Sequence, residues 1–103
     1  MTIELLYFND CPSWKTGLEN LRIALAEAGF EETVELIQVE TDEEAEAQRF
    51  QGSPSIRVNG EDIFPTGHEN YALGCRVYQT PEGMRGWPTV EMIREAIKQR
   101  VSV

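Results

Sequence analysis

The chain has 103 residues, the size of one domain, and its 41% apolar and 26% charged residues are typical of a folded globular protein rather than a disordered one. Nine lysines and arginines against eighteen aspartates and glutamates leave a net charge of −9. Such a surface repels phosphate backbones and anionic lipids, so we expect neither nucleic acid nor a membrane as a partner.

The sequence carries no recognisable secretion signal and no run of eighteen apolar residues. We therefore expect a cytoplasmic protein. Its only two cysteines are Cys11 and Cys75. In a cytoplasmic chain two cysteines do not form a disulfide scaffold, so they are either buried apolar residues or carry chemistry.

The first predicted unit is a strand, a sharp turn and a long helix. Residues 3–8 form a short apolar run that suits a central strand, and Asn9-Asp10 ends it as a turn. Pro12 suits the first position of a helix. The helix is predicted from the apolar spacing of Trp14, Leu18, Leu21, Leu25 and Ala28, with Gly29 as its stop.

A second strand is predicted over residues 34–39. Thr41 and Glu44 form a capping box that opens a short acidic helix, which runs to about Phe50 and closes at Gly52. Ser53-Pro54 precedes a third strand at 55–58, and Asn59-Gly60 predicts a hairpin returning over 62–64.

The last helix is predicted to begin at Pro88-Thr89, with Val90, Ile93, Ile97 and Val101 on one face. The segment 65–87 before it shows no sustained helical period, and we interpret it as an irregular insert. Within it, residues 75–78 are a short strand or a turn, and the pattern does not decide between them. The order β-α-β-α-β-β-α predicts a single α/β domain over 1–103, with helices on both faces of a four-stranded mixed sheet.

This order, with Cys11-Pro12 at the first strand-to-helix turn and Ser53-Pro54 before the third strand, resembles the thioredoxin and glutaredoxin superfamily. The resemblance covers the chain except 65–87. It implies that Cys11 is a partly exposed nucleophile, and that Pro54 is a cis-proline beside it. Ser53, Pro54, Pro12, Ser13 and Trp14 would then line the substrate groove.

The motif departs from the dithiol members of that superfamily. Their Cys-x-x-Cys is replaced by Cys11-Pro12-Ser13-Trp14, so the second thiol one turn along the helix is missing. A helix N-terminus stabilises a thiolate. We therefore expect a monothiol redox protein, a candidate thiol–disulfide oxidoreductase, in which Cys11 attacks a protein disulfide or an oxidised small thiol.

The neighbouring residues have two interpretations each. Ser13 either contacts the thiolate or caps the helix, and Trp14 packs under the turn or stacks on substrate. Cys75 either resolves a mixed disulfide on Cys11 or is a buried apolar residue, since sequence distance says nothing about spatial distance.

Arg76 and Tyr78 are candidate contacts for the carboxylate of a small thiol, or a solvated cation and a half-buried ring. His68, the only histidine, is expected to be exposed, and no metal-ligand spacing is present. We expect no cofactor beyond a low-molecular-weight thiol as co-substrate.

Two other functions remain open. The missing motif cysteine also suits a thioredoxin-like binding or adaptor module without turnover. The chain also bears a fainter resemblance to organomercurial lyases, which use two separated cysteines and an aspartate. Cys11, Cys75 and Asp10 would be the matching residues. That soft-metal hypothesis requires the two thiols to lie close together.

Overall fold

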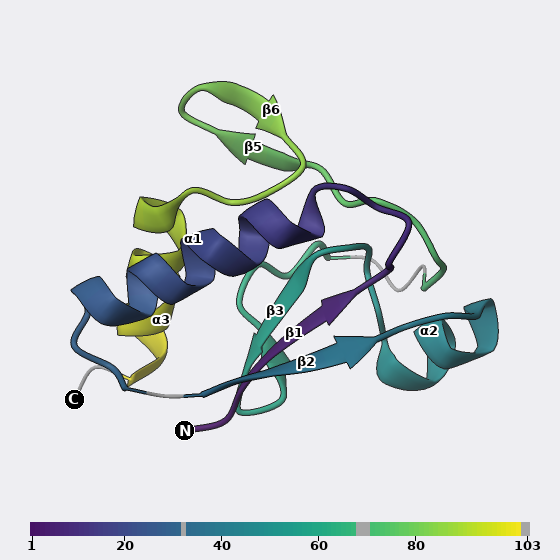
Figure 1. The fold of residues 1–103 in the computed structure, drawn as a ribbon, viewed down its shortest axis with the longest axis horizontal. Coiled ribbons are helices and arrows are strands. Elements are labelled where there is room, and N and C mark those ends of the chain that lie inside the picture. Colours follow the sequence, from purple (N-terminus) through teal and green to yellow (C-terminus); the bar gives the residue numbers. More distant parts are fainter. Residues whose placement is uncertain (32, 68–70, 102–103) are drawn as a thin grey trace.

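The computed structural model describes residues 1–31, 33–67 and 71–101, with the side chain of Val101 left out (Figure 1). The elements in chain order are β1 (Ile3–Tyr7), α1 (Trp14–Glu27), β2 (Val34–Gln38), α2 (Asp42–Gln48), β3 (Ser55–Val58), β4 (Glu61–Asp62), β5 (Tyr78–Thr80), β6 (Gly83–Arg85) and α3 (Val90–Val101). Within the described ranges no helix is both long and apolar enough to cross a bilayer.

The main sheet has four strands in the order β2-β1-β3-β4. β1 runs parallel to β2 and antiparallel to β3, and β3 pairs antiparallel with β4. The parallel pair is joined through α1, because parallel neighbours need a long crossover, while β3 and β4 are joined by the tight Asn59-Gly60 turn. The predicted mixed α/β sheet of four strands is confirmed.

Helices cover both faces of this sheet, as predicted (Figure 1). One core lies between the sheet and the helices α1 and α3, and its fully buried members include Leu5, Leu21, Ile56, Ile93 and Ile97. The second core lies under α2 and consists of Leu6, Val39, Ala45 and Phe50. β1 contributes to both cores because successive side chains of a strand point to opposite faces.

The short helix α2 covers only part of its face. The strand register places Glu35, Glu4, Arg57 and Asp62 in one row across that face of the sheet. All four side chains are at least partly exposed. A row of charged side chains tolerates water, so this part of the face needs no second helix over it.

Local capping signals are confirmed. The amide of Glu44 donates to Thr41 Oγ1 at 3.0 Å, and Glu44 Oε2 accepts from the amide of Glu40. α2 ends earlier than predicted, at Gln48, with Arg49 in the left-handed region at φ 55°. Thr89 accepts from the amide of Met92 and so caps α3.

The start of α1 differs from the prediction. The helix begins at Trp14, with Ser13 at the N-cap position, so Pro12 lies before the helix and not at its first position. The reason is a turn in which the Cys11 amide donates to the Phe8 carbonyl at 3.0 Å. Cys11 therefore lies two residues before the cap.

The segment 65–87 is not wholly irregular, which corrects the prediction. It contains the antiparallel hairpin of β5 and β6, with Tyr78 opposite Arg85 and Thr80 opposite Gly83. Figure 1 shows this hairpin projecting beyond α1, away from the main sheet. Tyr78 belongs to β5, whereas Cys75 makes only an isolated bridge, to Ser53.

Candidate functional site

Cys11 and Cys75 form a disulfide, with their Cα atoms 5.8 Å apart. This separation is within the usual range for disulfides. Three segments that are distant in sequence meet here: the turn after β1, the Ser53-Pro54 step before β3, and the extended chain before β5. The sequence left the proximity of the two cysteines open, and the structure brings them together.

The Ser53-Pro54 step lies directly beside the disulfide. Its peptide bond is cis, as the family resemblance implied. Cys11 Sγ lies 3.6 Å from the Ser53 carbonyl oxygen, a contact that becomes a hydrogen bond when the sulfur carries a proton. The same carbonyl accepts from the Arg76 amide at 2.9 Å, and the Ser53 amide donates to the Gly74 carbonyl at 2.8 Å.

The two sulfur-bearing residues differ sharply in accessibility. Cys11 is fully buried, whereas Cys75 is exposed. The expectation of a partly exposed Cys11 is therefore wrong in this oxidised form. The extended segment around Cys75 pairs with Ser53 next to Cys11 and is joined to it covalently.

Two small residues shape the contact between the segments. Gly52 has φ +114°, and a Cβ built there would lie 2.9 Å from Arg76 Cβ, so only glycine lets the Arg76 backbone approach this closely. The hydroxyl of Ser53 is buried and has no hydrogen-bond partner among the described residues. An unpartnered buried hydroxyl is a cost to folding, so its position beside the disulfide is notable.

The other predicted groove residues surround the turn. Pro12 is exposed, and Ser13 occupies the N-cap position without a side-chain cap hydrogen bond. The ring of Trp14 stacks on Tyr7 with centroids 4.1 Å apart and packs against the core under α1. Its packing interpretation is thus supported, while contact with substrate stays a prediction.

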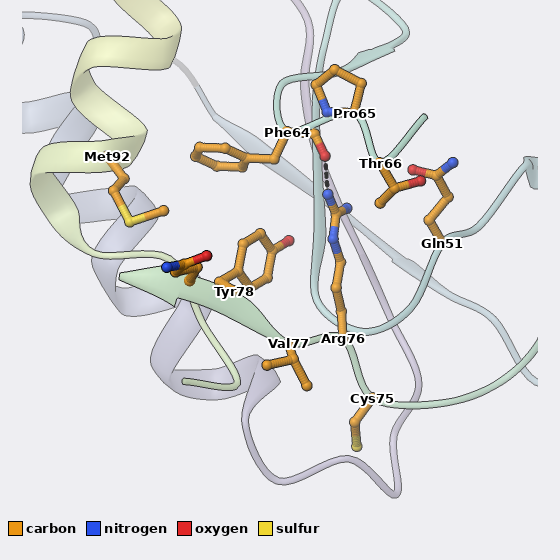
Figure 2. Close-up of a pocket in the computed structure, with 10 residues that line it drawn as sticks. Gln51, Phe64, Pro65, Thr66, Cys75, Arg76, Val77, Tyr78 and Met92 are labelled. Atoms are coloured by element: carbon orange, nitrogen blue, oxygen red, sulfur yellow. Dashed lines mark hydrogen bonds between the residues drawn. The ribbon is translucent and has the colours of Figure 1, made fainter. Parts of the chain in front are cut away.

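The guanidinium of Arg76 is directed away from the disulfide and is buried (Figure 2). It forms an ion pair with Asp62 at 2.8 Å, donates to Ser55 Oγ at 3.3 Å, and donates to the Phe64 carbonyl. It also lies over the Tyr78 ring, 4.7 Å from the centroid. The Arg76 guanidinium was predicted as a candidate contact for the carboxylate of a small thiol, but these internal partners already use its hydrogen-bond donors.

Tyr78 is anchored on the same network. Its hydroxyl donates to the Pro54 carbonyl at 2.6 Å, and its ring packs edge-on against Phe64. Burial raises the pKa of Tyr78 well above its ordinary value, the Arg76 guanidinium lowers it in part, and the Asp62 carboxylate raises it. The hydroxyl therefore stays protonated and serves as a hydrogen-bond donor.

A hollow of about 500 Å³ is lined in part by residues 75–79 (Figure 2). Its lining includes Arg76, Tyr78, Phe64, Met92 and Cys75. In Figure 2 the Cys75 side chain is directed away from the Arg76 guanidinium.

Some participants were not identified from the sequence. Asp62 and Ser55 were interpreted only as strand residues, and Gly52 as a helix stop, because their partner Arg76 is remote in sequence. Asp10, the aspartate of the fainter resemblance, is exposed in the turn after β1. His68 lies outside the described residues. Within those residues, no group of three or more histidine, cysteine or acidic side chains is arranged to hold a metal ion.

Comparison of the chain with protein-family models, with curated proteins and with solved structures returned no match.

Proposed function

We propose that this chain is a thioredoxin-like protein that carries out thiol–disulfide exchange through the Cys11–Cys75 pair. The observation that carries the proposal is an accessible disulfide beside the Ser53-Pro54 step: Cys75 is exposed, and its partner is buried against Ser53. The strand order β2-β1-β3-β4, with its parallel crossover and antiparallel hairpin, supports the thioredoxin-like topology.

The exchange proceeds in two balanced steps. An external thiolate attacks Cys75 Sγ, a new S–S bond forms there, and the Cys11–Cys75 bond breaks with its electron pair on Cys11 Sγ. A second external thiolate then attacks the mixed disulfide, which releases the external disulfide and leaves Cys75 as a thiolate. The two external thiols are oxidised to a disulfide, and the two protons that they release on ionising are taken up by Cys11 and Cys75, so the protein disulfide is reduced to a dithiol. The reverse sequence reduces a substrate disulfide.

This assignment exchanges the roles expected from the sequence, in which Cys11 attacks and Cys75 resolves. Cys75 is an exposed residue and Cys11 is fully buried, so we expect an external sulfur to attack at Cys75. The Ser53 carbonyl oxygen beside Cys11 Sγ accepts from a thiol and repels a thiolate, so it disfavours Cys11 as the resting nucleophile. Cys11 also lies before the helix cap, and the helix dipole weakens within the first turn.

The proposed reductant is a low-molecular-weight thiol, and the proposed substrates are protein disulfides or small oxidised thiols. We place the reaction in the cytoplasm, where disulfides of mesophilic proteins are usually transient or catalytic. In that setting the pair would cycle between its two redox states rather than persist as a structural crosslink.

The test is trapping with glutathione. Oxidised protein is incubated with reduced glutathione, quenched with acid and a maleimide, and mapped by peptide mass spectrometry. In the unsubstituted protein we expect the glutathione adduct on Cys75. Cys11→Ser has no disulfide to open, so the single-serine variants are treated with oxidised glutathione instead, which leaves one glutathione on the thiol and releases the other. We expect the Cys75 adduct to accumulate in Cys11→Ser, because no resolving thiol remains. Cys75→Ser is the matched control and should carry far less adduct.

Turnover is measured with the same variants. Catalytic amounts of protein should accelerate the reduction of 2-hydroxyethyl disulfide by glutathione, and either serine variant should slow it. A disulfide that resists excess glutathione, with no acceleration of the assay, would contradict the proposal and favour the adaptor module.

A second candidate function is capture of a soft metal by the reduced pair. It requires the two thiols to lie close together, and the 5.8 Å separation of their Cα atoms meets that requirement. Thiolates are the preferred protein ligands of soft cations. Reduced protein titrated with Hg²⁺ should bind one ion tightly, and either single serine variant should lose that binding. Capture that persists in both variants would exclude the pair as the site.

A further inference from the structure

We propose that Arg76 is a positioning residue that keeps Cys75 within bonding reach of Cys11 after the disulfide is opened. The inference rests on the proposed exchange reaction and assigns it a residue that contacts neither the sulfur nor the substrate. Its consequence is a preorganised dithiol, in which Cys75 stays close to Cys11 and the intramolecular disulfide re-forms readily.

The anchoring of Arg76 is extensive for a residue next to an exposed cysteine. Its guanidinium is buried and contacts the Asp62 carboxylate, the Ser55 hydroxyl and the Phe64 carbonyl. These partners lie on β3 and β4 or directly after β4, so they belong to the main sheet or its margin and are independent of the Cys11 turn. Reduction of the disulfide removes none of them.

The backbone carries this anchoring to Cys75. In extended chain, adjacent side chains point to opposite sides, and Figure 2 shows Cys75 and Arg76 directed apart. The Arg76 amide is bonded to the Ser53 carbonyl, and the Gly74 carbonyl accepts from the Ser53 amide. Cys75 is thus held between two paired neighbours, with its side chain on the Cys11 side.

Further contacts restrain the same segment. The Leu73 amide donates to Asp42 Oδ1 at 3.1 Å upstream of Cys75, and the Tyr78 hydroxyl donates to the Pro54 carbonyl downstream. Arg76 is the buried charged member of this set and lies over the Tyr78 ring, so its loss would also loosen the downstream contact.

The choice of arginine supports a geometric role. In the Arg76–Asp62 pair the guanidinium is buried and the carboxylate is half-buried. A shielded ion pair is often no more stabilising than well-packed apolar side chains of similar volume, but it accepts only a narrow range of arrangements. The planar guanidinium fixes several partners at once, which lysine cannot do. A restraint of this kind lowers the conformational freedom that the dithiol must lose when the disulfide forms.

The test is the equilibrium of the folded protein with glutathione. Protein dithiol and oxidised glutathione exchange with protein disulfide and two reduced glutathione molecules, and the constant is measured by acid quenching across redox buffers. We expect Arg76→Met to lower this constant about tenfold, which lies within the range of couplings between residues linked through a shared backbone shift. The protein with glutathione attached to Cys75 should accumulate correspondingly.

Matched variants make the result specific. Arg85→Met removes an exposed arginine on β6, the strand that pairs with β5, and should leave the constant unchanged. Asp62→Asn retains the shape of the Arg76 site without the ion pair and should give a smaller decrease. Arg76→Lys should recover only part of the loss. If Arg76→Met does not fold, the glutathione constants of Asp62→Asn and Arg76→Lys test the inference, and unchanged constants in both would overturn it.

A purely structural role predicts a different outcome. Arg76→Met would then destabilise the oxidised and reduced proteins equally, and the glutathione constant would not change. That result would overturn the inference while leaving exchange at Cys75 intact. If the proposed function is wrong, the unsubstituted protein itself should show neither turnover nor glutathione trapping.

Discussion

Ser53 and Cys75 form one rung of a parallel β-bridge, and both backbone hydrogen-bonding groups of Ser53 are used in it. The residue before Pro54 therefore pairs with the cysteine segment of its own chain, while its carbonyl lies 3.6 Å from Cys11 Sγ. Because the bridge and the disulfide join the same segments, opening the covalent bond leaves a non-covalent link between them.

The buried Ser53 hydroxyl gives a first prediction. It has no hydrogen-bond partner among the described residues, so Ser53→Ala should leave the free energy of unfolding unchanged or raise it by up to about 1 kcal/mol. Urea unfolding of the oxidised protein measures this. A loss of more than about 1 kcal/mol would contradict it and indicate a partner for the hydroxyl. Ser55→Ala is the matched control, because that hydroxyl bonds to both Gly52 and Arg76 and its loss should destabilise.

Removal of the disulfide should lower stability substantially. The two cysteines are 64 residues apart, and closure of a loop of this length restricts the unfolded chain by about 4 kcal/mol in the chain-entropy model. Measured values are commonly lower, so we expect a decrease of about 2–4 kcal/mol on reduction. Urea unfolding with and without a phosphine reductant measures it.

The control for that experiment is the Cys11→Ser/Cys75→Ser variant, which should be insensitive to the reductant and should resemble the reduced protein. If the reduced protein were as stable as the oxidised protein, the prediction would be contradicted, because the Cys11–Cys75 disulfide would then contribute nothing to the free energy of unfolding.

Much of the fold was predictable because its signals are local. The Asn59-Gly60 turn requires positive φ at both positions, and these residues adopt 52° and 85°. The Thr41–Glu44 capping box depends only on residues three apart. The apolar runs and the turn signals predicted the elements and their chain order, and the long crossover predicted the parallel pairing of β1 with β2.

The site was less predictable because its contacts are not local. Cys11 is buried where it pairs with Cys75, which lies 64 residues further along the chain. No local sequence pattern at either cysteine indicates this pairing. From the sequence alone Arg76 could equally be a solvent-exposed cation, because its ion-pair partner Asp62 is fourteen residues earlier in the chain. The β5–β6 hairpin carried a weak local signal, since Pro81-Glu82-Gly83 is a turn sequence with Gly83 at φ +102°, but its strands are only three residues long.

Gly17 gives a prediction in which two effects oppose each other. Replacing a helical glycine with alanine normally stabilises by about 0.5–1 kcal/mol. Here the new Cβ would lie 2.7 Å from Pro54 Cγ, where the ring packs against α1. We expect Gly17→Ala to destabilise by about 1–3 kcal/mol, because overpacking outweighs the helix preference.

Urea unfolding compares Gly17→Ala with Ala26→Gly, which tests helix preference at an exposed position of the same helix. Ala26→Gly should cost only the preference itself. A stabilised Gly17→Ala protein would mean that α1 and the Pro54 loop can separate without loss.

The hydroxyl of Tyr78 makes stability depend on pH in the alkaline range. Burial raises the pKa of Tyr78 in the folded protein above its ordinary value of about 10, with a smaller opposing effect of Arg76. Above that pH the unfolded chain loses the proton while the folded protein keeps it. The contribution of Tyr78 is therefore fully present below about pH 10, and it falls by about 1.4 kcal/mol for each further pH unit until the folded pKa is reached.

Tyr78→Phe separates this effect from other titrations, and urea unfolding of both proteins in the oxidised form measures it. At pH 8 the variant should be less stable by about 1–2 kcal/mol, because the Pro54 carbonyl loses its donor. As the pH rises toward 11 the wild-type protein should lose this advantage, since the variant has no group here to ionise. A difference that stays constant from pH 8 to 11 would mean that the Tyr78 hydroxyl ionises equally readily in the folded and unfolded states, against its burial beside Pro54.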